Sequence, residues 1–127
     1  MRGVLLDTHA WARSLLSDKL LSAKAQAAIE RADSVFVSPI SFFEIAQKIR
    51  IGKWPQMEPF VERLPSLLRT QGGMIAALVP EIAINAGVMP WTHRDPFDRL
   101  LAATAIHYGL PLISADAIFD GAIARIW

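Results

Sequence analysis

Residues 3–12 read GVLLDTHAWA, a short apolar run that stops at an acidic residue and a threonine. A continuous apolar run of this length is typical of a buried strand in a parallel sheet, where both faces of the strand are covered. Similar runs occupy residues 34–37, 74–79 and 112–114, and residues 124–127 could form a fifth strand at an edge. The sequence therefore predicts a sheet of four to five strands.

Helical patterns fill the segments between these runs. Ser22 is suited to cap one helix, Ser38 and Pro39 to start the next, and Gly52 to end it. Pro65 must kink or divide the helical stretch in which it lies. The predicted helices cover residues 10–16, 22–32, 40–51, 57–70, 80–88 and 96–108. This alternation predicts an α/β fold, a three-layer domain in which helices flank a central, mainly parallel sheet.

The composition limits what this chain can be. At 127 residues it is long enough for one substantial core, and we expect residues 1–127 to form one domain. Hydrophobic residues make up 53%, which excludes a disordered chain, and the net charge of +1 gives no overall attraction to nucleic acid. The absence of cysteine excludes disulfides and thiolate metal sites. We expect a cytoplasmic protein, because the apolar run before Asp7 is too short for a signal peptide.

Four acidic residues from separate stretches stand beside the predicted strands and helix starts: Asp7, Glu44, Asp98 and Asp116. In open α/β sheets, ligand sites gather beyond the carboxyl ends of the strands. We therefore expect the four side chains to form one acidic cluster at one end of the sheet. Each also has an ordinary explanation when taken singly, because Asp7 could turn the chain and Glu44 could be a solvated helix residue. Asp98 and Asp116 could likewise complement helix starts.

A cluster of four carboxylates is electrostatically costly. Two carboxylates about 5 Å apart repel by roughly 3 kcal/mol at an effective dielectric constant near 20. Several such pairs would rival the roughly 5–15 kcal/mol by which a typical domain is stable, so the cluster must be protonated, spread apart or neutralised by a cation. Oxygen ligands without histidine or cysteine suit Mg²⁺ or Mn²⁺. Such ions activate water and assist in-line displacement at phosphorus, so the leading chemistry is hydrolysis of a phosphodiester.

Other residues near the acids could support this chemistry. The hydroxyl groups of Thr8 and Ser114 could orient a carboxylate, although plain turn residues would give the same pattern. We assign no catalytic role to His9 or His93, because turn or core histidines are more common. Basic residues that could contact RNA phosphates are Lys48, Arg50, Lys53, Arg94 and Arg99. Tryptophans that could stack on bases, but more commonly belong to a core or an interface, are Trp11, Trp54 and Trp91.

Four segments follow one another along the chain: LLDTHAWA (5–12), SPISFFEIAQKIRIGKW (38–54), HRDPFDRLLAATA (93–105) and GLPLISAD (109–116). With these segments the chain closely resembles the PIN-domain ribonucleases, in particular the VapC-type toxins of bacterial toxin–antitoxin pairs. The resemblance implies a metal-dependent endoribonuclease whose Mg²⁺ or Mn²⁺ is held by Asp7, Glu44, Asp98 and Asp116. It assigns no catalytic role to Asp95. It further implies RNA as substrate, inhibition by a small cognate antitoxin, and self-association into a homodimer.

Two other classes with clustered acids fit the sequence less well. A two-component receiver domain needs a mid-chain aspartate and a late lysine, yet no Asp lies between Asp33 and Asp95 and no Lys follows Lys53. A haloacid-dehalogenase-type phosphatase needs a second aspartate two residues after the first, where this chain has His9. The main alternative is a catalytically silent binding module that keeps the PIN fold and acts through RNA or protein association.

Overall fold

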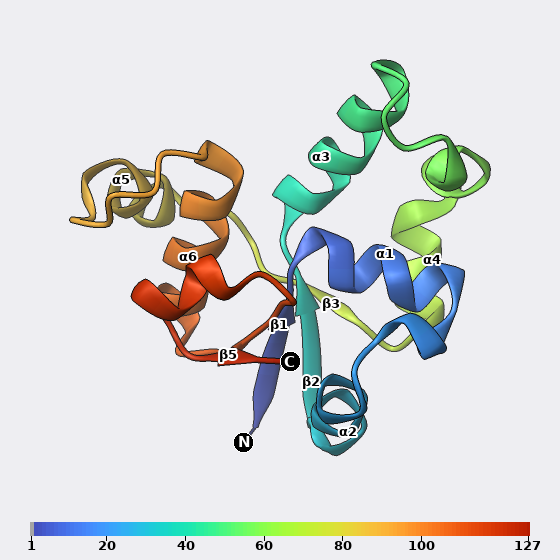
Figure 1. The fold of residues 1–127 in the computed structure, drawn as a ribbon, viewed down its shortest axis with the longest axis horizontal. Coiled ribbons are helices and arrows are strands. Elements are labelled where there is room, and N and C mark those ends of the chain that lie inside the picture. The colour runs from blue at the N-terminus through green and yellow to red at the C-terminus, as the bar shows by residue number, and fades with distance from the viewer. Residues whose placement is uncertain (1) are drawn as a thin grey trace.

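The computed structural model, which describes residues 2–127, contains a five-stranded parallel sheet in the order β3-β2-β1-β4-β5 (Figure 1). The strands are β1 (Gly3–Leu6), β2 (Ser34–Val37), β3 (Met74–Ile75), β4 (Leu112–Ile113) and β5 (Arg125–Ile126). Leu6 pairs with Val37 on one side and with Ile113 on the other. Because these three strands end in register, the residues that follow them come together at one edge of the sheet.

α-Helices and short 3₁₀ helices connect the strands in the predicted alternating order. They are α1 (Thr8–Leu16), η1 (Asp18–Leu20), α2 (Ala23–Arg31), α3 (Pro39–Arg50), η2 (Pro55–Arg63), α4 (Leu64–Thr70), α5 (Pro80–Val88), α6 (Pro96–Tyr108) and η3 (Ala117–Gly121). Ser22 and Ser38 cap α2 and α3 through their side chains, and Gly109 ends α6 in the left-handed conformation at φ 65°. Pro65 lies where η2 gives way to α4, which confirms the predicted division.

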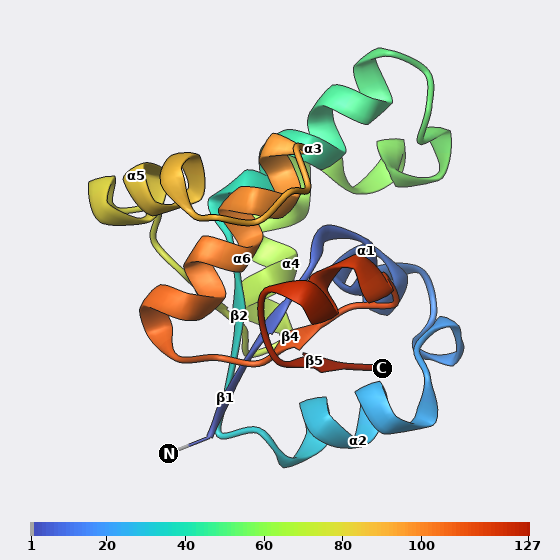
Figure 2. The same ribbon diagram turned by 60° about the vertical axis from the view of Figure 1, so that its left-hand side comes forward.

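Helices cover both faces of the sheet, so the fold has three layers (Figures 1 and 2). Successive side chains of a strand point to opposite faces. Val4 and Leu6 accordingly belong to a core cluster formed with α1, α2 and α4, whereas Leu5 lies in a second cluster with α6 and η3. Helix α3 starts at the carboxyl end of β2 and contacts both α1 and α6. These three helices therefore meet beyond the carboxyl ends of the strands.

The α/β class and the parallel sheet are confirmed, and three predicted elements differ from their expected bounds by more than one residue. The stretch predicted as a helix over residues 57–70 starts at Pro55 and is a 3₁₀ helix as far as Arg63. Strand β3 ends at Ile75, because β2 turns into α3 after Val37 and residues 77–79 continue past the end of their partner. The first helix begins at Thr8 instead of residue 10, because the Asp7 side chain accepts the Ala10 N–H (2.7 Å) and caps it. Within residues 2–127, every helix falls short of the length or apolar character needed to cross a bilayer.

Candidate active site

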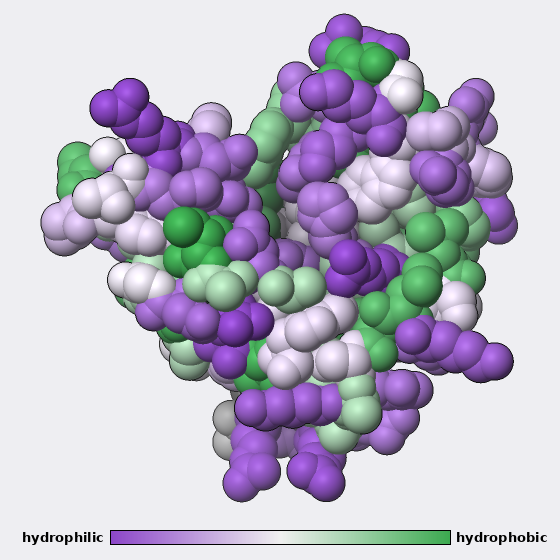
Figure 3. Space-filling view, in the orientation of Figure 1, coloured by the Kyte–Doolittle hydropathy of each residue, from purple (hydrophilic) through white to green (hydrophobic). Residues whose placement is uncertain are grey.

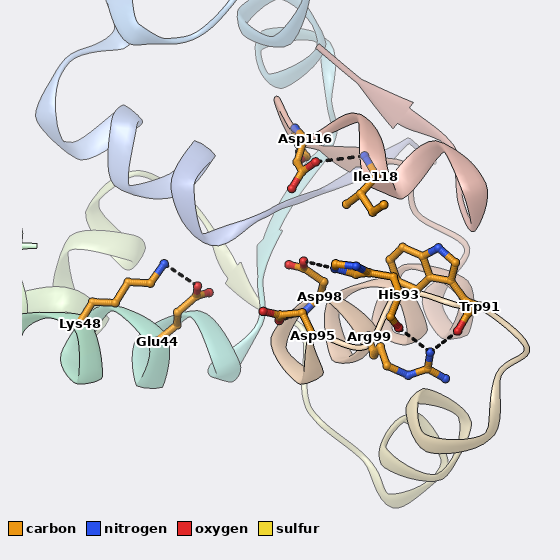
Figure 4. Close-up of polar contacts among 10 residues, drawn as sticks. Glu44, Lys48, Trp91, His93, Asp95, Asp98, Arg99, Asp116 and Ile118 are labelled. Atoms are coloured by element: carbon orange, nitrogen blue, oxygen red, sulfur yellow. Dashed lines mark hydrogen bonds and ion pairs between the residues drawn. The ribbon is translucent and has the colours of Figure 1, made fainter. Parts of the chain in front are cut away.

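The four acids selected from the sequence line one cavity of about 180 Å³. Asp7 directly follows β1, Asp116 follows β4, Glu44 lies on α3 and Asp98 lies in the first turn of α6. In Figure 4, Glu44, Asp98 and Asp116 extend from three different elements toward a shared space. Figure 3 shows a notch between the α3 side and the α6 side of the molecule, bordered mostly by hydrophilic residues. The expected meeting of these four side chains at one end of the sheet is therefore what the fold produces.

Asp7 is the most enclosed of the four acids, with 6% of its surface exposed. Its Oδ1 accepts the Ala10 N–H, so the carboxylate also caps α1. Burial raises the pKa of Asp7, because a charged carboxylate loses its hydration in the protein interior, and the nearby charge of Glu44 acts in the same direction. Hydrogen bonds from the Ser114 hydroxyl and the Ala10 N–H oppose the rise in this pKa. The cap keeps an ionisable group in a position where ionisation is disfavoured.

Glu44 is paired with a cation from its own helix. The Lys48 Nζ lies 2.9 Å from Glu44 Oε2, one helical turn further along α3, and only 8% of the Glu44 surface is exposed. The same ammonium lies 5.4 Å from the centre of the Trp54 ring, which stacks on His9 at 4.9 Å. Lys48 therefore faces the cavity and partly neutralises it, whereas we expected it among the residues that contact RNA phosphates.

Asp98 has a histidine partner from the loop that precedes α6. His93 Nε2 lies 2.7 Å from Asp98 Oδ2, and the Asp98 N–H donates to the Asp95 side chain (3.0 Å). Burial raises the pKa of Asp98, and the charges of Asp95 and Asp116 raise it further, whereas the contact with His93 lowers it. Asp95 caps α6 through its side chain, and it also lines the acidic cavity.

Asp116 is exposed and caps a short helix. Its Oδ1 accepts the Ile118 N–H (3.0 Å) at the start of η3, and its own N–H donates to Ser114 Oγ (3.0 Å). The buried Ser114 hydroxyl therefore contacts both Asp116 and Asp7. The Thr8 hydroxyl bonds instead to Ser41 Oγ at 2.8 Å, which links α1 to α3.

The chemistry of this donor set fits a hard divalent cation, while the observed side-chain positions favour internal partners. Within residues 2–127, no three acidic or histidine side chains are arranged as a metal site. Lys48, His93 and two backbone N–H groups each contact a single carboxylate oxygen. A carboxylate has two oxygens with about four acceptor sites, so these contacts leave capacity for a further ligand. A cation would therefore have to compete with neutralising contacts that already exist.

Only some of the basic and aromatic residues that we expected to contact RNA are exposed. The expectation that Arg99 contacts RNA is wrong, because its guanidinium donates to backbone carbonyls at the end of α5 and in the following loop. Trp11 is fully buried and donates to Gln71 (2.9 Å), which agrees with the core role that we considered more common for these tryptophans and excludes base stacking. The basic side chains that remain exposed are those of Arg50, Lys53 and Arg94.

Two partners of the acids were missed in the sequence. The spacing of four residues between Glu44 and Lys48 on a predicted helix is a sufficient signal for an ion pair. The pairing of His93 with Asp98 has no such signal, because it depends on the path of an irregular loop.

Comparison with known proteins assigns this architecture to a family. The PIN domain family matches residues 4–122. Ribonuclease VapC22 of Mycobacterium tuberculosis is 35% identical over 120 residues, which cover 91% of this chain and 88% of the relative.

Two solved structures share the fold at low sequence identity. A toxin–antitoxin complex from Klebsiella pneumoniae aligns with a TM-score of 0.69 at 18% identity and covers 98% of this chain and 96% of its own. VapBC2 from Rickettsia felis, bound to a DNA fragment from their promoter, aligns with a TM-score of 0.70 at 15% identity and covers 97% and 96%. The family match over most of the length, together with the relative at 35% identity, shows that this chain belongs to the PIN-domain family and is a relative of the VapC ribonucleases.

Proposed function

We propose that this chain is a metal-dependent endoribonuclease that hydrolyses RNA and acts as the toxin of a toxin–antitoxin pair. The observation that carries the proposal is the cavity in which Asp7, Glu44, Asp98 and Asp116 meet beyond the carboxyl ends of the strands. The relative named Ribonuclease VapC22 supports the reaction, and the solved toxin–antitoxin complexes of the same fold support the biological setting. In this proposal residues 1–127 form one nuclease unit that acts in the cytoplasm.

The four carboxylates would hold Mg²⁺ or Mn²⁺, which supplies charge neutralisation and Lewis-acid activation of water and phosphate when bound. The chain itself contributes fixed positions for these oxygens, because Asp7 and Asp116 are held by backbone N–H groups and Asp98 by His93. Burial raises the pKa of Asp98 in the metal-free protein, so binding of a cation at this carboxylate would favour loss of its proton. Ser114 would keep Asp7 and Asp116 at a constant separation through its hydroxyl.

RNA would reach the cavity along a modestly basic border. Arg50 lies in the last turn of α3, Lys53 follows it, and Arg94 lies in the loop before α6. These cations therefore belong to the two segments that carry Glu44 and Asp98. Contacts of this kind bind phosphates without distinguishing bases. Lys48 would exchange its contact with Glu44 for a phosphate once a cation takes over that carboxylate.

A partner protein would dock at a cavity of about 250 Å³ whose lining includes residues of α1, α2 and α4. Its partly exposed apolar residues are Ile29 and Val35, with the core residues Leu6, Leu21 and Leu68 at its base. Apolar anchors of a helical segment commonly dock into such grooves, and the antitoxin is the partner that we propose. Met74, Ile75, Ile84 and Val88, on β3 and α5, are also exposed and provide apolar surface for a homodimer.

A catalytically silent RNA- or protein-binding module is the second candidate, and one observation favours it. Every acid of the cavity already has a partner within the protein, and Lys48 and His93 supply countercharge or hydrogen bonds without a metal. The two candidates differ in turnover. The purified chain is expected to cleave an unstructured RNA with Mg²⁺ or Mn²⁺ and to stop in EDTA, whereas a silent module would bind the RNA and leave it intact.

The toxin role is tested in cells. Expression of the chain alone is expected to arrest growth, and co-expression of a small protein encoded beside it should restore growth. The Glu44→Gln variant is the matched control, because it keeps size and hydrogen bonding while removing a carboxylate. Harmless expression of protein that cleaves RNA in vitro would contradict the toxin role without affecting the nuclease assignment.

A further inference from the structure

The loop between α5 and α6 is held in place by a single arginine. The Arg99 guanidinium donates to the carbonyl oxygens of Ala86 (2.7 Å), Met89 (2.6 Å), Trp91 (2.5 Å) and His93 (2.8 Å). An arginine presents five N–H donors in a rigid planar group, so four carbonyls that converge on it fix the path of the backbone between them. Arg99 itself stands on α6, one residue after Asp98.

This fixed backbone sets the position of one histidine ring. The His93 carbonyl is bound by Arg99, and the His93 ring packs at 5.0 Å from the Trp91 ring. Trp91 in turn packs at 5.8 Å from the buried ring of Phe119. With its backbone and its ring both held, His93 directs Nε2 at Asp98 Oδ2 (2.7 Å), as Figure 4 shows.

The contact selects one orientation of the Asp98 carboxylate. A side chain in the first turn of a helix has several accessible rotamers, and ordering it for ligand binding has an entropic cost. A partner that donates to one carboxylate oxygen holds the side chain in one rotamer before a ligand binds, so the entropic cost at binding is smaller. The second carboxylate oxygen stays available to the ligand. Asp98 lines the acidic cavity, so its second oxygen can serve a ligand there. Groups that orient a ligand-binding side chain in this way typically contribute 10- to 100-fold to metal affinity.

We propose that His93 is a positioning residue of the acidic cavity: its hydrogen bond orients the Asp98 carboxylate toward a divalent cation, and Arg99 holds the loop that delivers it. The inference rests on the proposed metal-dependent function. It concerns a residue that neither the acid cluster nor the resemblance to a family assigned to the site.

Two substitutions separate the hydrogen bond from the packing of the ring. His93→Phe keeps an aromatic ring beside Trp91 and removes the N–H donor, whereas His93→Gln removes the ring and keeps an amide N–H that can reach Asp98. The binding of Mn²⁺ to the purified protein without RNA is measured by electron paramagnetic resonance, alongside kcat and KM for RNA cleavage. Melting temperatures in EDTA check that both variants are folded.

We expect His93→Phe to weaken Mn²⁺ binding by about 10- to 100-fold and to lower kcat, with little change in KM for RNA. His93→Gln should stay within a few-fold of the wild type in both measurements. A His93→Phe variant that binds Mn²⁺ like the wild type would overturn the inference, and so would equal losses in the two variants, since the ring alone would then matter. Wild-type protein that neither binds Mn²⁺ nor cleaves RNA would instead refute the proposed function.

Discussion

The Asp7→Asn substitution separates a structural role of this residue from a role in a metal site. Asparagine and aspartate are comparable N-caps, so the bond from the Ala10 N–H to Oδ1 can be kept. The new amide N–H₂ lies near Ser114 Oγ, which has two acceptor sites and uses one for the Asp116 N–H. The substitution therefore removes the charge of the buried side chain and keeps its shape and the helix cap. The bond with Ser114 changes direction, because the hydroxyl donates to the carboxylate and would accept from the amide.

The sign of the effect follows from the burial of Asp7. With 6% of its surface exposed, the ionised carboxylate has lost most of its hydration, a penalty of several kcal/mol for a buried ion. The charge gains at most about 2 kcal/mol from the N-terminus of α1, and the Ser114 hydroxyl offsets part of the remainder. We therefore expect metal-free Asp7→Asn to be more stable than the wild type by about 1–2 kcal/mol. For a chain of this size that corresponds to a rise in melting temperature of roughly 3–8 °C.

Thermal unfolding at pH 7 in EDTA and in excess Mn²⁺ provides the assay. The wild type should gain about 2.7 kcal/mol at a free Mn²⁺ concentration 100 times its dissociation constant, because the ion binds the folded state. Asp7→Asn should lose most of this gain, together with RNA cleavage. A variant that is less stable than the wild type in EDTA, yet keeps its full response to Mn²⁺, would refute the reasoning and leave Asp7 as a plain helix cap.

Three further predictions follow from the same contacts. Because burial raises the pKa of Asp7, the folded state binds this proton more tightly than the unfolded state does. The metal-free wild type should therefore lose stability as the pH rises from the ordinary pKa of aspartate through the raised one. Melting curves of Asp7→Asn should show a smaller dependence on pH over this range. Lys48→Met should lower the free energy of unfolding in EDTA by about 1–2 kcal/mol, because Glu44 keeps a nearly buried charge, and the double variant with Glu44→Gln should recover most of the loss in denaturant titrations. Arg99→Gln should cost about 3 kcal/mol in the same titrations, whereas Arg94→Gln, at an exposed position, should stay within about 0.5 kcal/mol.

The features that the sequence predicts correctly depend on neighbouring residues or on a general rule of the fold. Ser22, Ser38 and Gly52 mark helix ends because capping is decided within one turn of chain. Asp7 and Asp116 could be placed at one edge because parallel strands end on the same side of a sheet.

The features that could not be predicted from the sequence depend on where distant segments of the chain end or turn. Strand β3 is short because β2 stops at Val37, which cannot be read from the apolar run at residues 74–79. Arg99 looks like a surface cation beside an acid until the loop before α6 is seen to wrap its carbonyls around the guanidinium. The His93 contact with Asp98 is a consequence of that wrapping, so it could not be anticipated from spacing.

The most direct test of the four-carboxylate site is to locate the cation itself. Crystals of the wild type grown with Mn²⁺ and measured near the manganese absorption edge should show an anomalous difference peak in the cavity lined by Asp7, Glu44, Asp98 and Asp116. Oxygens of at least two of these carboxylates should lie at about 2.0–2.3 Å from the peak, with water completing the coordination. The peak should disappear in crystals of Asp7→Asn grown under the same conditions. An empty cavity in crystals of protein that cleaves RNA with Mn²⁺, or a peak bound elsewhere, would contradict the account.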